Sequence, residues 1–289
     1  MLDENSQVCP AFNEFAEWRA ENLPEDPSRH LVVYTCIAKA EFRKSADVLQ
    51  KFADQEIKPD RRGRTFTRVA FVSPDVPLLP DHGWRVFSPL VTGEIVERAD
   101  HHDNPRRWAR RHKMLPHRIF PEEFAHYSLW MDGTHSLRVN PWSVVDSSLN
   151  NGRASFAAFN HPQRSCVFDE AIACLRLRKD DPVAVNRQYR QMCREGFPRR
   201  YGLWETRVVV RHHVDPFCIR LCEAWARRLD AGSARDQIAL PLALWDVNNS
   251  LAPSESPVVL GTIPGRGEQS DARFAYHPHR TGPSRWDHR

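Results

Sequence analysis

The 289-residue chain is long enough for one full hydrophobic core, and its 41% hydrophobic content with nine tryptophans predicts a folded globule. It lacks both the ~20 consecutive apolar residues that cross a bilayer and the basic start of a signal peptide, so we expect a cytoplasmic protein without a transmembrane segment. The net charge of +4 is small for a nucleic-acid-binding protein, and seven irregularly spaced cysteines favour reduced thiols.

Strand and helix signals alternate along the chain. Residues 1–28 predict a lead-in helix, 31–37 a strand, 45–55 a helix, 69–72 and 84–87 two strands, and 104–115 a basic helix. Strands follow at 127–131, 155–159 and 204–210, with helices after 140 and at 167–178, 182–194, 215–229 and 233–245. This order predicts an α/β domain over residues 29–250 with one mainly parallel sheet flanked by helices, followed by a loosely held, Pro/Gly-rich tail over 251–289.

The strand at 127–131 ends in a carboxylate and a glycine, Asp132 and Gly133. Ligands of open α/β sheets lie beyond the carboxyl ends of strands, where such a pair can approach a metal or a phosphate. A hairpin turn is an equally good interpretation, because Asp-Gly is a common hairpin dipeptide. If the sheet is parallel, His161 and either His212 or His213 should lie at the same edge, since each follows a strand.

Basic residues crowd into the segment before this strand, namely Arg98, Arg106, Arg107, Arg110, Arg111, Lys113 and Arg118. Phosphate groups need such donors, because their charge is costly to desolvate and arginine can bind them through two hydrogen bonds. A nucleic-acid-binding surface and a solvent-exposed helix face are alternative interpretations.

Three further pairs of polar residues each have a functional and a structural interpretation. His161 and Arg164 suit a metal or a phosphate, although a loop histidine can simply bond to the backbone. Trp204 and Glu205 suit a sugar, although the tryptophan can belong to the core. Asp236 and Gln237 in the first turn of a helix satisfy its dipole, and the aspartate could also act on an acceptor hydroxyl.

A zinc site is conceivable at Cys218 and Cys222 with His212 and His213. Two cysteines on one helical face are more often buried small hydrophobic residues, and no second pair of ligands completes the site.

Taken in order, these motifs resemble a glycosyltransferase-like family known from plant cell-wall proteins and bacterial cell-surface gene sets. The resemblance covers roughly residues 30–247 and rests on Tyr34-Thr35, Arg110 through Pro116-His117, Leu129 to Gly133, His161 with Arg164, Asp169-Glu170-Ala171, Glu195-Gly196, Gly202 to Glu205 with Arg211, and Arg235 to Gln237.

The resemblance implies a nucleotide-sugar transferase of the single-sheet, type A-like fold that passes a sugar to a glycan or other hydroxyl acceptor, in cell-surface polysaccharide synthesis. It assigns catalysis to Asp132 and Asp236. The implied donor-binding residues are Tyr34, Thr35, Arg110, Arg111, Lys113, Asp132, Gly133, His161 and Arg164. The implied acceptor-binding residues are Trp204, Glu205, Arg235, Asp236 and Gln237.

The resemblance also implies Mn²⁺ or Mg²⁺ bound by Asp132 and His161, with one departure from the pattern. Thr134 stands where such enzymes carry the second Asp of an Asp-x-Asp motif, which leaves metal dependence open. The same departure favours the main alternative, a non-catalytic nucleotide- or carbohydrate-binding protein of this fold. A nucleic-acid-binding protein using residues 98–118 is a third hypothesis, disfavoured by the small net charge.

Overall fold

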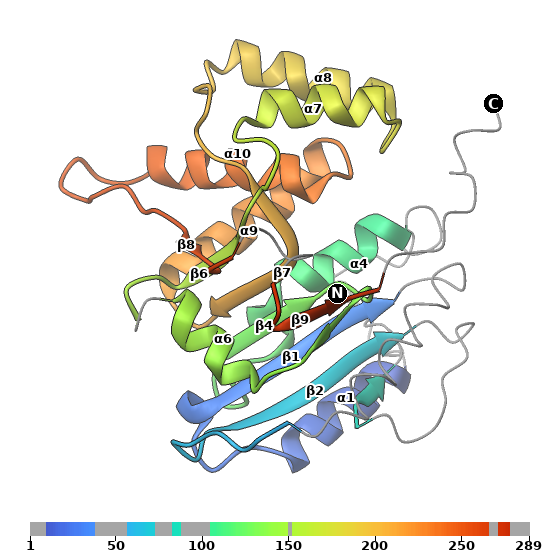
Figure 1. The fold of residues 1–289 in the computed structure, drawn as a ribbon, viewed down its shortest axis with the longest axis vertical. Helices are drawn as coiled ribbons and strands as arrows, with labels where there is room; N and C mark the ends of the chain where they lie inside the picture. Colours follow the sequence, from blue (N-terminus) through green and yellow to red (C-terminus); the bar gives the residue numbers. More distant parts are fainter. Residues whose placement is uncertain are drawn as a thin grey trace, which may run out of the picture.

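The computed structural model describes residues 10–37, 57–72, 83–87, 105–149, 152–265 and 271–277 (Figure 1). The helix predicted at 45–55 and the basic residue Arg98 lie outside these ranges. A seven-stranded sheet of order β3-β2-β1-β4-β7-β6-β8 forms the centre. Its strands are β1 His30–Ile37, β2 Thr65–Val72, β3 Arg85–Phe87, β4 Tyr127–Met131, β6 Phe156–Asn160, β7 Trp204–His212 and β8 Gly261–Thr262.

The sheet is parallel except at β7, which confirms the predicted α/β fold with a mainly parallel sheet. β3, β2, β1 and β4 run in one direction and β8 is parallel to β6, whereas β7 is antiparallel to both β4 and β6. The prediction that His212 or His213 lies beside Asp132 is therefore wrong, because it assumed a parallel β7. Instead, the first residues of β7 lie where β4 and β6 end, and His212 lies at the opposite edge.

Helices cover both faces of the sheet because its central strands are apolar on both sides. All eight residues of β1 are buried. Val32 and Tyr34 belong to a core shared with the helices α1 Pro10–Glu21, α4 Pro105–Met114, α9 Pro216–Ala231 and α10 Asp236–Asn249. Leu31 and Val33 belong to a second core with α6 Pro141–Ser148 on the other face. The short helices η1 Pro27–Arg29 and α5 Pro116–Ile119 complete this part.

Two further helices, α7 Val167–Arg176 and α8 Pro182–Arg194, form an outer layer on α10 (Figure 1). Their contact is a third apolar cluster that includes Val185, Met192 and Leu242. Asp181 caps α8 and Asp215 caps α9, each followed by a proline at the first helical position, where no donor is lost.

Both ends of the described chain are packed onto this domain. Phe15 of α1 is buried against Phe71 and Phe120, which docks the predicted lead-in helix. Beyond residue 251, β8 joins the sheet, and β9 Phe274–Tyr276 pairs antiparallel with β5 His135–Leu137. The prediction of a loosely held tail is wrong for these two segments, because short apolar runs such as Phe274-Ala275 are buried in the sheets.

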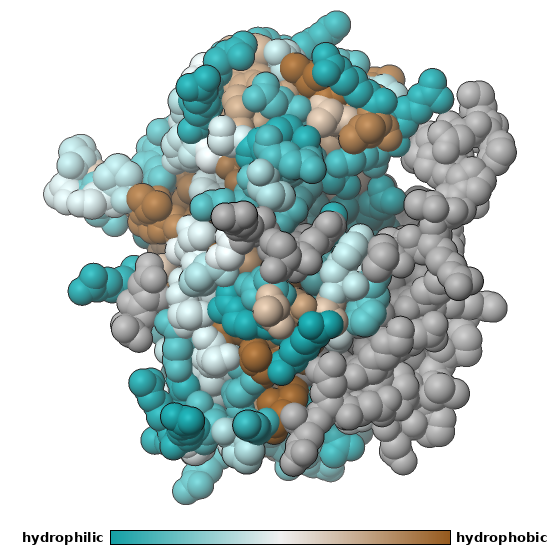
Figure 2. Space-filling view, in the orientation of Figure 1, coloured by the Kyte–Doolittle hydropathy of each residue, from teal (hydrophilic) through white to brown (hydrophobic). Residues whose placement is uncertain are grey.

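None of the helices within the described ranges is long and apolar enough to cross a bilayer. Figure 2 shows hydrophilic residues over most of one face, with apolar residues in small separate patches.

Candidate active site

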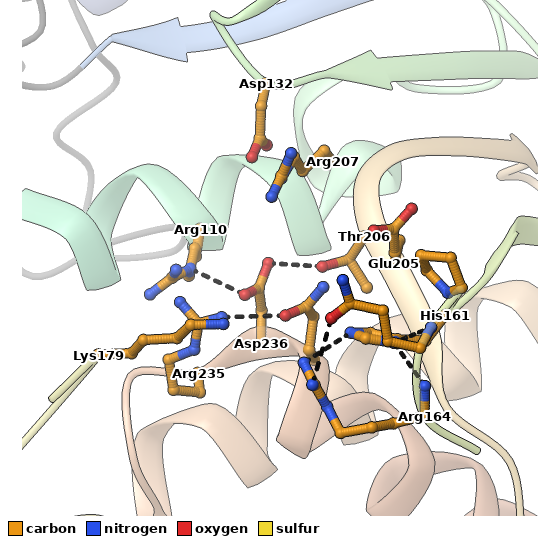
Figure 3. Close-up of a pocket in the computed structure, with 13 residues that line it drawn as sticks. Arg110, Asp132, His161, Arg164, Lys179, Glu205, Thr206, Arg207, Arg235 and Asp236 are labelled. Carbon is orange, nitrogen blue, oxygen red and sulfur yellow. Dashed lines mark hydrogen bonds and ion pairs between the residues drawn. The ribbon is translucent and has the colours of Figure 1, made fainter. Parts of the chain in front are cut away.

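A pocket of about 400 Å³ lies at the sheet edge where β4 and β6 end and β7 begins (Figure 3). Five basic and three acidic side chains line it, together with a histidine and small polar residues. The full lining is Arg110, Asp132, His161, Pro162, Gln163, Arg164, Lys179, Glu205, Thr206, Arg207, Arg235, Asp236 and Gln237. Most of the predicted site residues therefore come together, from five separate parts of the chain.

Asp132 projects into this pocket directly after β4. Its Oδ1 accepts a hydrogen bond from Trp130 Nε1 at 2.7 Å and lies 3.4 Å from Lys113 Nζ. Its side chain is 36% exposed, so a ligand in the pocket can reach it. The hairpin interpretation of Asp132-Gly133 is wrong, because the strand that follows the turn, β5, pairs with β9 and not with β4.

Asp236 occupies the first turn of α10 and is almost fully buried. Its carboxylate lies 2.6 Å from Lys113 Nζ and 3.2 Å from Arg110 Nε, and it accepts a hydrogen bond from Thr206 Oγ1 at 2.9 Å. Burial alone would raise the pKa of this carboxyl group, but the positive charges of Arg110, Lys113 and Arg235 hold it well below its usual range. Asp236 is therefore ionised and firmly held.

Lys113 forms ion pairs with both aspartates but does not itself line the pocket. Only 2% of its side chain is exposed, and its ammonium group contacts both Asp132 and Asp236. Tyr34, a predicted donor-binding residue, lies behind it in the core, where its hydroxyl donates to Lys113 O at 3.0 Å and accepts from Arg211 at 2.9 Å. Tyr34 therefore supports the end of α4 and does not line the pocket.

The opposite wall is organised around one buried acid, Glu170 of α7. Its side chain is fully buried, and Oε2 lies 2.7 Å from the guanidinium of Arg164. Arg235 approaches Oε1 at 3.8 Å, and His161 Nε2 lies 3.7 Å from Oε2. The sequence pointed to Glu170 only through the family resemblance, and the structure shows why an acid is needed: it fixes Arg164 and Arg235 at the pocket.

A β-bulge brings two further residues to the pocket, Thr206 and Arg207. Ala158 of β6 pairs with Val209, but the next residue, Phe159, pairs with Glu205. The residues between them have no partner in β6, and such bulges redirect side chains near functional sites. Neither residue was among the predicted site residues, although the polar triplet Glu205 to Arg207 before three valines is a signal that could have marked them.

The other predicted site residues do not line the pocket. Arg111, next to Arg110 on α4, points to α9 and lies 3.1 Å from Asp230. Trp204 is buried in the core and packs against Gly202, where an added Cβ would meet the ring at 2.4 Å. Thr35 is buried within β1, and Gly133 lies in the turn beside the pocket. The structural interpretation of Trp204 is therefore the right one.

The predicted metal ligands do not fit a divalent cation. His161 Nδ1 accepts hydrogen bonds from the backbone N–H groups of Gln163 and Arg164, and Nε2 lies 3.1 Å from the Arg164 guanidinium. Thr134, at the position of a second acid, is buried and hydrogen-bonded to His135. Across the described ranges no three His, Cys, Asp or Glu side chains form a possible metal site, and Cys218 and Cys222 lie in the core.

Comparison with known proteins supports the resemblance seen in the sequence. The model of the TOD1/MUCI70 glycosyltransferase-like domain matches residues 93–255, more than half of the chain. The chain belongs to this family. A probable hexosyltransferase, MUCI70 of Arabidopsis thaliana, is 31% identical over 164 residues, which are 54% of this chain and 26% of the relative. The chain thus matches about a quarter of that relative's length.

Two solved structures align weakly with most of the chain. Mouse xyloside xylosyltransferase 1 aligns with a TM-score of 0.44 at 12% identity, over 75% of this chain and 81% of that one. An active-site mutant of LgtC aligns with a TM-score of 0.38 at 11% identity, over 74% and 69%. Within the TOD1/MUCI70 match lie β4, β6, β7 and α10, and therefore the whole lining of the pocket.

Proposed function

We propose that this TOD1/MUCI70-family domain transfers a hexose from a nucleotide-diphosphate sugar to a hydroxyl group of a glycan or other acceptor. One observation carries the proposal: four residues assigned to the donor and four assigned to the acceptor line a single pocket at the carboxyl ends of β4 and β6. The family membership and the name of the plant relative, a probable hexosyltransferase, support the same class of reaction.

In this reaction the bond between the sugar carbon and the diphosphate oxygen breaks, and its electron pair stays with the phosphate. Negative charge grows on the leaving group, and Arg110, Arg235 and Lys113 are held where they can stabilise it. Burial lowers the pKa of Arg110 to about 10, so its guanidinium remains charged at neutral pH. The acceptor oxygen forms the new bond to the sugar carbon, and its proton passes to the released nucleoside diphosphate.

Asp236 has a different role from the one first expected. A carboxylate whose pKa lies far below neutral is a weak general base, because base strength follows pKa. We therefore assign Asp236 to the positioning of Arg110 and Lys113. Glu205 and Gln237, which line the same pocket, are the groups available to the acceptor hydroxyls.

The test is a turnover assay of the purified chain with UDP-, GDP- and ADP-linked hexoses, in which the released nucleoside diphosphate is measured with and without glycan acceptors. Arg110→Gln should reduce release about a hundredfold, because a charge that stabilises the leaving group is lost. Arg111→Gln is the matched control, since Arg111 is the next residue on the helix but pairs with Asp230 outside the pocket.

Two outcomes would contradict the proposal. Equal activity of both variants would remove Arg110 from the site. Donor binding without release of nucleoside diphosphate, with every acceptor, would instead support a non-catalytic sugar-nucleotide-binding protein.

A further inference from the structure

We infer that the pocket binds the donor's diphosphate directly through its basic side chains, without a bridging divalent cation. The inference rests on the proposed function and specifies how that site holds its substrate. Three features of the described residues carry it: the balance of charge, the surroundings of Asp132 and the anchoring of the arginines.

The balance of charge suits a bare diphosphate. The lining has two more basic than acidic side chains, and the buried Lys113 and Glu170 just behind it add one charge of each sign. Within a nucleotide sugar each phosphate is esterified and carries a single negative charge, so the surplus matches the diphosphate. Arginine suits this ligand, because its planar guanidinium can donate two hydrogen bonds to one phosphate.

The surroundings of Asp132 are those of a paired carboxylate and not of a metal ligand. Oδ1 already receives Trp130 Nε1 and faces the Lys113 ammonium at 3.4 Å. An Mg²⁺ ion about 2.1 Å from that oxygen would lie within about 5.5 Å of the ammonium group, and the two positive charges would repel each other. Lys113 thus already supplies a positive charge beside Asp132, in the place of the one that a metal ion would bring.

The arginines are fixed before a ligand arrives. Asp236 orients Arg110, and Glu170 orients Arg164 and approaches Arg235. Each guanidinium carries five N–H donors, more than these carboxylate contacts use. Side chains that are already ordered lose little entropy on binding, so anchoring by buried acids raises affinity for an anion. In Figure 3 Arg110 and Arg235 lie beside Asp236, and Arg164 lies farther along the pocket, near His161.

The experiment measures binding of UDP, GDP, ADP and inorganic pyrophosphate by calorimetry, in EDTA and in Mg²⁺ or Mn²⁺, for the wild type and two variants. We expect binding in EDTA to be at least as tight as with metal. Asp132→Asn should tighten binding about threefold or more, because it removes a negative charge next to the phosphates. Asp230→Asn is the matched control: this aspartate pairs with Arg111 outside the pocket and should leave affinity unchanged.

The outcomes separate this inference from the proposed function. Binding that requires Mg²⁺ or Mn²⁺ and is lost in Asp132→Asn would overturn metal-free binding and leave the sugar-transfer proposal standing. No binding of any of the four compounds, with or without metal, would overturn both. Thermal unfolding of each variant identifies a loss of affinity that is merely a loss of folding.

Discussion

The two edges of the central sheet each carry a pocket, of about 400 and about 500 Å³, and they differ in how their charges are paired. The second pocket lies at the start of β4 and the end of β7, around Tyr127 and His212. Its size alone would make it an equal candidate. The two pockets are similar in volume, so the feature that distinguishes them is how their charged side chains are paired.

In the second pocket the central arginine, Arg64, is paired with two carboxylates. Arg64 makes two hydrogen bonds of 2.7 Å to Asp146 and a further ion pair of 2.9 Å with Asp60, and it stacks on Trp142 at 4.2 Å. Hydrogen bonds to Asp146 and Asp60 raise the pKa of Arg64 above its ordinary value. In the first pocket it is Asp236 that is surrounded by cations. Its lining has two more basic than acidic side chains, against one more in the second pocket.

Replacing the central acid of each pocket should show this difference most strongly. Asp236→Asn leaves the buried Arg110 and Lys113 with only Asp132 as a nearby acid, and we expect it to lower the free energy of unfolding by about 3 kcal/mol. Asp146→Asn, at a partly exposed ion pair, should cost less than about 1 kcal/mol. Urea unfolding of both variants measures the two costs. Equal losses of unfolding free energy in the two variants would mean that Asp236 and Asp146 are buried to a similar extent, which would contradict the distinction between the pockets.

A fall in pH should destabilise the fold, but His161 in the first pocket should stay uncharged until the pH approaches 4. Burial lowers the pKa of His161 to about 4 and that of His213 to about 3. In the unfolded chain a histidine pKa is about 6.5, so the unfolded state binds more protons between pH 6.5 and 4, and stability falls as the pH falls through that window. We expect each such histidine to contribute a loss of roughly 2 kcal/mol between pH 7 and 5.

Urea unfolding at several pH values measures this loss, and His213→Gln should make the decline shallower. Because His161 stays neutral and the phosphates of a nucleotide sugar do not titrate in this range, affinity for a nucleotide sugar should be constant from pH 8 to 6. A rise in affinity over that range as the pH falls would show that the pocket gains a positive charge.

The smallest expected effect concerns the acid that anchors the arginines. Glu170→Gln should raise the donor KM about tenfold, equivalent to ~1.4 kcal/mol, with little change in kcat, because Arg164 and Arg235 become less ordered. Glu223→Gln is the matched control, since Glu223 pairs with Arg118 and His117 away from the pocket. An equal effect of Arg64→Gln in the second pocket would contradict the distinction between the two edges.

Much of the site could be predicted from the chain, because it depends on local patterns. The apolar run before Asp132 predicted β4 with its observed bounds, and the basic segment predicted α4 with Arg110 and Lys113. The aspartate at the start of a helix likewise located Asp236 at the start of α10. In each of these cases a short sequence determines an element and the residue at its end.

The features that could not be predicted depend on the direction of a strand in the sheet and on contacts between segments far apart in the chain. Nothing within residues 204–212 states that the strand is antiparallel, because direction follows from pairing with β4 and β6. The same holds for the bulge that exposes Thr206 and Arg207, and for β9, which supports the turn after Asp132 through the hydrogen bond from His277 N to Thr134 O.

The sequence by itself determined the alternation of strands and helices, the acid after β4 and the basic character of the site, since these follow from hydrophobic period and composition. Only the tertiary structure decided which charges face the pocket and which are used up in pairs. Arg110 and Arg111 are neighbours in the chain, yet one pairs with Asp236 at the pocket and the other with Asp230 outside it. The physical reason is that successive residues of a helix point about 100° apart, so packing of α4 against α9 and α10 assigns their partners.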